Sequence, residues 1–273
     1  MSSLRDLIAA LLALLGAVLL GAALPAVWLQ QHVVDEDGFV AIAGPVGSDP
    51  EVRDQLSDEA ASRITEDSSL PAWAQDRLDP LVQEQVDDLS ESDVYQRVWV
   101  SSMRELHQQL FSPGPTELSV DLTPVASAIT DPIEKTLPVE IPVPDDLDVT
   151  IATIPRIALL EKSSLLDPWA GRMLPAGIVC AAVALLIARH RRAILVLEGI
   201  AGMAAGGLLL FALHDLEGLV PDAVDQLPLL GSVVQAFEDQ LAADVRPQAI
   251  FLAGVSTLVM AVGIVLMGLR RRS

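Results

Sequence analysis

Four long apolar runs constrain this chain more than any other feature of its sequence. They cover residues 7–29, 173–188, 193–213 and 249–269, and the only charged residue in any of them is Glu198, in the third. A helix needs about 20 apolar residues to cross the ~30 Å hydrocarbon core of a bilayer. Backbone polar groups in lipid must be satisfied within the spanning segment, so apolar runs of this length are helical. We therefore predict four transmembrane helices.

The charges are sorted between the segments that join these runs. Residues 30–170 hold 28 acidic and 8 basic side chains, and residues 214–247 hold 7 acidic and 1 basic. Residues 1–6, the loop 189–192 and the tail 270–273 together hold seven arginines and one aspartate. Because basic segments stay in the cytoplasm, we expect both termini inside the cell and both acidic segments outside. The protein is then a multi-pass cell-membrane protein.

Composition narrows the classes of partner and of chemistry. The net charge of −20 disfavours nucleic acid as a partner, and the single cysteine, Cys180, allows no internal disulfide. We expect membrane lipids and a protein of the envelope as partners, with divalent cations held loosely at the acidic surface. We expect no cofactor and no metal site.

The fold class that follows is a mainly α-helical membrane protein with an extracytoplasmic domain between the first two transmembrane helices. That domain is expected to be helical with a small β element. The first run exceeds the ~7–15 apolar residues of a signal peptide, so we expect it to remain as an anchor. The expected parts are the first tail and helix (1–29), the acidic domain (30–170), two helices with a basic loop (171–213), an outer loop (214–247) and the last helix with its tail (248–273).

Within the acidic domain, residues 48–51 form a helix start, in which a capping residue precedes Pro50 in the first turn. A helix from Ser92 should carry an apolar stripe from Tyr95 to Leu110. Alternating residues predict short strands, and proline-rich sequence predicts an extended connector. The remaining expected elements are a helix from Pro71, strands at 117–122 and 148–153, a helix at 123–136, a connector at 138–144 and a helix at 155–166.

Two features of the outer side concern the membrane surface. Trp28 and Trp169 stand at the outer ends of the first two runs, where tryptophan anchors helices at the interface. Residues 229–241 form an amphipathic helix, which lies either on the membrane surface or against the acidic domain. The lack of Lys and Arg on this stretch favours docking on protein.

Small residues and one acid stand out inside the apolar runs. The small-residue positions are Ala9, Ala13, Ala17, Gly21, Gly202 and Gly206. Such residues let helices approach closely, and we favour packing within the chain over dimerisation. Glu198 has two interpretations: an acid paired with Arg189, Arg191 or Arg192, or a coupling point within the bundle. The second predicts that Glu198→Gln folds and inserts.

Other candidates for chemistry are weak. The acidic cluster at 35–38 has a glycine at its fourth position, not the sixth that a calcium loop requires, and is expected to be a solvated turn. His107 has no serine at a helical spacing suited to a nucleophile–base pair. Cys180 has no basic neighbour to stabilise a thiolate. We therefore expect a protein that is not an enzyme.

Several segments carry a resemblance. They are Asp37-Gly38-Phe39-Val40, residues 44–52, the spacing Trp99–Arg104–His107, and the stretch 118–122. In these the chain resembles uncharacterised envelope membrane proteins of high-GC Gram-positive bacteria, which have an anchor helix, an outer helical domain and further spans. The resemblance implies an architecture and no activity. In topology alone the chain also resembles four-span permease subunits of ABC systems.

Two function classes follow. The first is a non-catalytic envelope protein with a scaffold, accessory or sensing role exerted through its acidic outer domain. The alternative is a permease-like subunit of an ABC-type export or cell-envelope complex, with the ATPase on another chain. An ATPase that co-purifies with the protein would favour the alternative.

Overall fold

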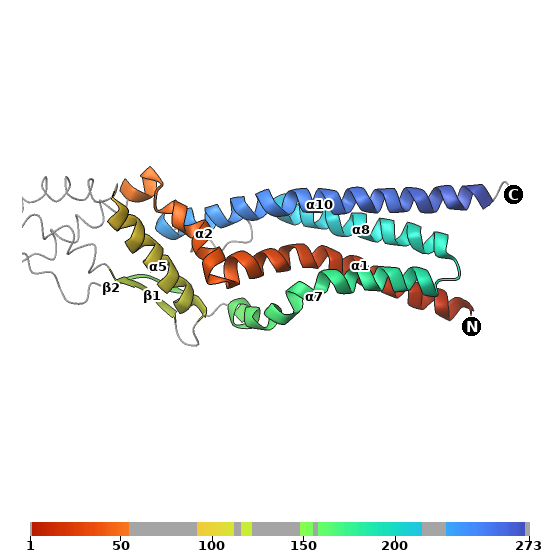
Figure 1. The fold of residues 1–273 in the computed structure, drawn as a ribbon, viewed down its shortest axis with the longest axis horizontal. Coiled ribbons are helices and arrows are strands. Elements are labelled where there is room, and N and C mark those ends of the chain that lie inside the picture. The colour runs from red at the N-terminus through yellow and green to blue at the C-terminus, as the bar shows by residue number, and fades with distance from the viewer. Residues whose placement is uncertain are drawn as a thin grey trace, which may run out of the picture. The chain divides into compact units, whose positions relative to one another are not determined.

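A computed structural model describes the helical segments and two strands of the chain (Figure 1). The described residues are 2–54, 92–111, 116–121, 148–154, 158–214 and 228–270. The chain divides into two compact units. The first contains Met1–Val34, Lys162–Pro221 and Glu238–Ser273, and the second contains Asp35–Glu161 and Asp222–Phe237.

The first unit is a bundle of long helices (Figure 1). They are α1 (Ser2–Leu29), α7 (Ala158–Ile187), α8 (Arg191–His214) and α10 (Pro228–Arg270), with α10 in this unit from Glu238 onward. Among the described residues, four helical segments are long and apolar enough to cross a membrane: Leu4–Val34, Trp169–Ile187, Arg191–His214 and Gly231–Leu269. The prediction of four spanning helices is confirmed by the length and composition of these helices.

The ends of these helices differ from the prediction. The helix expected at 155–166 and the second run are one helix, α7, which continues through Pro168 and Pro175. The amphipathic stretch 229–241 and the fourth run are also one helix, α10, which contains Pro247. A helix satisfies its own backbone groups, so it has no need to stop where its sequence changes from polar to apolar. At the C-terminal end of α1, a π-helical turn, η1 (Gln30–Val34), follows directly.

The second unit begins with a helix that the sequence did not predict. The carboxylate of Asp35 accepts a hydrogen bond from the backbone N–H of Gly38 at 2.9 Å and caps α2 (Glu36–Val46). The acidic cluster is therefore the capped first turn of a helix; Asp35 and Asp37 are solvent-exposed as expected, and acids at this position suit the helix dipole. The predicted start at 48–51 is confirmed: Asp49 accepts from the N–H of Glu51 at 2.9 Å, and residues 50–54 are helical.

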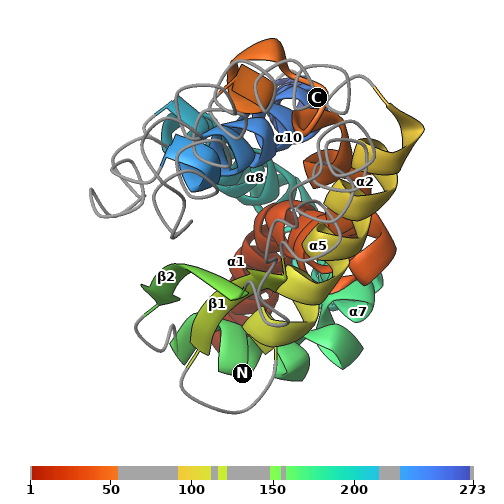
Figure 2. The same ribbon diagram turned by 90° about the vertical axis from the view of Figure 1, so that its left-hand side faces the viewer.

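The predicted helix from Ser92 is α5 (Asp93–Phe111). The hydroxyl of Ser92 accepts a hydrogen bond from the backbone N–H of Tyr95 at 3.3 Å. Tyr95, Trp99, Met103 and Leu106 are all buried, as the stripe requires. After α5, strands β1 (Thr116–Asp121) and β2 (Asp148–Ile154) pair antiparallel, with an irregular register between Leu118 and Ser119 (Figure 2). They lie where the alternating residues predict strands.

The core of the second unit joins three segments distant in sequence. Its buried residues are Phe39, Ala43, Val52, Trp99, Met103, Leu106 and Val233, with Phe237 packed against them. The indole N–H of Trp99 donates to the carbonyl of Ala43 at 2.9 Å. Val233 and Phe237 belong to the amphipathic stretch, so its apolar face packs on protein, as the charge argument favoured.

Several predicted elements lie outside the described residues. These are the helix from Pro71, the helix at 123–136 and the proline-rich connector at 138–144.

Candidate functional site in the helix bundle

Glycines bring α8 and α10 into backbone contact. A Cβ at Gly199 would lie 2.5 Å from Cβ of Met260, and one at Gly206 would lie 3.0 Å from the carbonyl oxygen of Ala249. A Cβ at Gly202 would collide with the side chain of Ser256. These approaches leave no room for a larger residue on this face of α8. The sequence singled out Gly202 and Gly206, and Gly199 was missed although it continues the same helical face.

The small residues of α1 also lie in contacts within the chain. Ala9 and Ala13 are buried in a cluster with Ala184, Ala188 and Ile194. Ala17 is buried, and a Cβ at Gly21 would lie 3.0 Å from Cβ of Ala205. A second contact that the sequence did not reveal joins α1 to α7, where a Cβ at Gly16 would lie 3.0 Å from the carbonyl of Gly177. Which glycines face a neighbour depends on how the helices pair, and periodicity alone does not determine that.

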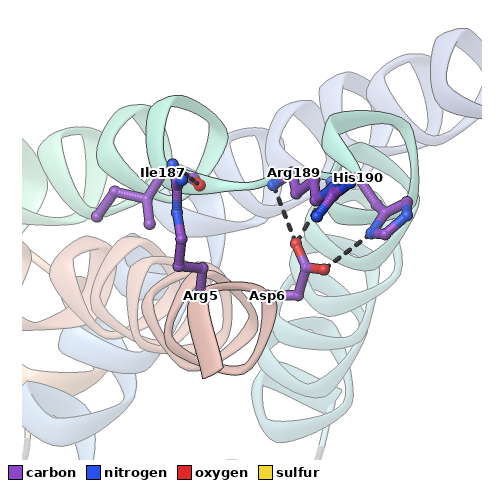
Figure 3. Close-up of polar contacts among 5 residues, drawn as sticks. All are labelled: Arg5, Asp6, Ile187, Arg189 and His190. Carbon is purple, nitrogen blue, oxygen red and sulfur yellow. Dashed lines mark hydrogen bonds and ion pairs between the residues drawn. The ribbon is translucent and has the colours of Figure 1, made fainter. Parts of the chain in front are cut away.

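A polar clasp closes the basic end of the bundle (Figure 3). The carboxylate of Asp6 accepts hydrogen bonds from the backbone N–H groups of Arg189 and His190, at 3.0 and 3.3 Å, and contacts Nδ1 of His190 at 2.8 Å. The guanidinium of Arg5 donates to the carbonyl of Ile187 at 3.1 Å. The start of α1 thus caps the start of α8 and the end of α7. From the sequence alone, Arg5 indicated only the orientation of the first helix.

Glu198 lies inside the bundle without the partners that the sequence suggested. Its Oε1 atom is buried and has no hydrogen-bond partner among the described residues. The same is true of Nη1 of Arg192, so the proposed pair with this arginine is not formed. No ion pair of Glu198 with Arg189 or Arg191 is present in the described part of the chain either. Most buried polar atoms in native proteins have a hydrogen-bond partner, so an unpaired carboxyl oxygen inside the bundle is unusual.

The structure corrects the expectation for Trp28. Its side chain is 5% exposed, and its Nε1 donates to Oδ2 of Asp244 at 3.0 Å. Gln240 donates to the same oxygen at 3.0 Å, and the ring of His32 stacks on the indole at 4.9 Å. Trp28 therefore ties α1 to α10 and does not face lipid headgroups. Trp169 is 61% exposed, and interfacial anchoring remains a prediction for it.

His107 and the acidic cluster, which the sequence marked as weak candidates for chemistry, take part in packing contacts and ion pairs. His107 is buried against the rings of Phe39 and Phe111, at centroid distances of 5.2 and 4.6 Å. Glu36, in the acidic cluster, pairs with Arg104 at 2.9 Å. Within the described ranges, no three metal-ligating side chains are grouped.

An apolar groove of about 460 Å³ opens on the first unit. It runs between α1, α7 and α10, and Gln248 is its one polar lining residue. The other lining residues are Leu20, Leu24, Leu174, Ile178, Pro247, Phe251, Leu252 and Val255. Its volume falls within the ~300–1,000 Å³ typical of small-molecule sites.

No family model, curated protein or solved structure matches this chain.

Proposed function

We propose that this is a non-catalytic protein of the cell envelope, with a scaffold, accessory or sensing role exerted through an acidic extracytoplasmic unit. In this proposal the basic clasp and the C-terminus are cytoplasmic, and residues 30–170 and 214–247 are outside. The resemblance to envelope proteins of high-GC Gram-positive bacteria belongs to the same proposal.

One observation carries the proposal: the core of the second unit includes part of the helix that contains the fourth span, and a helix that closely follows the first span in the chain. Phe39 follows α1 after η1, and Val233 and Phe237 belong to the first turns of α10. Any partner that changes the packing of this core acts on Val233 and Phe237, which lie on the same helix as the fourth span, and on Phe39, which follows the first span after η1 and the capping residue Asp35. Such a connection would let a sensing subunit pass a change in the outer unit to its fourth span.

The surface of the second unit supports a polar partner. All large apolar side chains that the described residues expose belong to the first unit. The acidic charge of residues 30–170 would attract a cationic protein surface and repel nucleic acid.

Photo-crosslinking in intact cells tests the proposal. A photoreactive residue replaces Ser101 or Glu105, which are both exposed on α5, or Arg191 as the control at the basic end. We expect Ser101 and Glu105 to yield a covalent adduct with one envelope protein, which also co-purifies in mild detergent. Adducts formed only at Arg191, with a soluble ATPase, would contradict the proposal.

The groove supports a second candidate, a permease-like subunit of an ABC-type export or cell-envelope complex. Its apolar lining would accept a lipid chain from the bilayer. Co-purification with an ATPase, and lipid binding that is lost when Ile178 and Leu252 are replaced by tryptophan to fill the groove, would together favour this candidate.

A further inference from the structure

The direction of the Glu198 side chain follows from its neighbours on α8. Ile194, one turn before it, packs in the cluster with Ala9 and Ala13 of α1. Gly202, one turn after it, meets Ser256 of α10. Residues four apart share a helix face, so Glu198 points to the region where α1, α8 and α10 meet. The exposed residues Ile200 and Ala204 lie on the other side of α8.

No cation in the described residues faces this carboxyl. The described parts of α1 and α10 carry no charge between Leu7 and Leu29 or between Ala249 and Leu269, and the polar side chain of α10 that lies against Gly202 is that of Ser256. On α7, Cys180 is the one titratable group between Met173 and Ala188. The charged residues of α1 that precede its apolar run, Arg5 and Asp6, belong to the clasp.

The basic residues of α8 itself do not reach it. Arg192 is six residues away, which corresponds to ~9 Å along the helix axis and ~120° around it. Arg191 shares the face of Glu198 but lies two turns nearer the helix end, and it is exposed. An ionised carboxylate that is buried in an apolar bundle without a cation is costly.

We infer that Glu198 is a proton-binding site within the membrane bundle. The carboxyl holds a proton taken from the aqueous phase at the clasp end, which lies ~10 Å away along α8. Loss of this proton places a bare negative charge where α1, α8 and α10 meet and weakens their packing. This inference goes beyond the proposed function and does not depend on it.

Labelling with a hydrophobic carbodiimide tests the inference on the full-length protein in native membranes. N,N′-dicyclohexylcarbodiimide reacts with protonated carboxyl groups in apolar surroundings, and mass spectrometry of peptides locates the adduct. We expect Glu198 to be labelled, and the labelling to fall as the pH is raised, because the reagent reacts with the protonated carboxyl group and each pH unit above the titration midpoint cuts the protonated fraction about tenfold. Glu36, which is paired with Arg104, should stay unlabelled.

A variant separates proton binding from a merely structural role. Glu198→Gln keeps the polar shape but cannot ionise, so it should insert normally, and its thermal stability should not change over a pH range in which that of the wild type falls as pH rises. Glu105→Gln removes an exposed acid of the second unit and should retain the wild-type pH dependence. Absence of labelling at every pH, labelling independent of pH, or failure of Glu198→Gln to insert would each overturn the inference.

Discussion

Replacing Gly199 by alanine should separate α8 from α10. The added Cβ would lie 2.5 Å from Cβ of Met260 and 2.6 Å from both the backbone nitrogen of Met260 and the carbonyl oxygen of Ser256. Two of these three atoms belong to the backbone, so a side-chain rotation cannot relieve the clash, and the helices must move apart. Overpacking of this kind costs ~1–3 kcal/mol.

Gly207→Ala is the matched control. Gly207 also lies in α8, but a Cβ there would have no atom within 4 Å. Alanine is favoured over glycine in a helix by up to ~1 kcal/mol, so this variant should be as stable as the wild type or slightly more stable. Both substitutions add the same methyl group to the same helix, and only the packing differs.

The assay is thermal unfolding of the full-length protein in mild detergent, followed as loss of the monodisperse species. A loss of 1 kcal/mol lowers the Tm of a chain of this size by ~2–4 °C, so Gly199→Ala should unfold several degrees below Gly207→Ala. Equal melting temperatures for the two variants would refute the close approach of α8 and α10.

Three further predictions concern polar groups. Tyr95 is the chain's one tyrosine, and burial raises its pKa to about 12, against the opposing effect of the Arg53 charge. The ultraviolet titration of the phenol should therefore have its midpoint near 12 in the folded protein and near ~10 in denaturant, and stability should fall as the pH rises through that interval. Trp28→Phe leaves Asp244 without its indole donor and should cost ~1–3 kcal/mol in the same thermal assay, whereas an anchor at the lipid interface would tolerate the change. Asp6→Ala removes the acceptor of the backbone N–H groups of Arg189 and His190 and should speed hydrogen exchange at both amides. Exchange at the amide of Gly199 should not change.

The spanning segments could be predicted because hydrocarbon demands a long apolar run, which a sequence displays directly. The ends of α7 and α10 could not, since helices continue into polar sequence when the next turns find a packing surface. Residues 229–241 show this: Val233 and Phe237 bury their side chains in the second unit, and the helix runs unbroken into the fourth span.

The contacts within the bundle were predictable only in part. The small residues of α1 and α8 reveal close packing, but Gly16 and Gly177 face each other only because of how α1 and α7 pair. Trp28 has the position of an interfacial anchor, and its burial depends on Asp244, which is 216 residues away in the chain. Residues 36–46 contain two glycines and a proline, which disfavour a helix in a prediction from sequence, although the segment forms a helix capped by Asp35.

Cysteine accessibility tests the central claim, which is that acidic segments face outward and the arginine-bearing end faces the cytoplasm. Single cysteines replace Ser101 on α5 and Arg191 at the start of α8, each in a Cys180→Ala background and each at an exposed position. With a membrane-impermeant maleimide, we expect intact cells to label the cysteine at position 101, and the one at position 191 to react only after the membrane is opened. Labelling of position 191 from outside, or protection of position 101 until the cells are opened, would contradict the account.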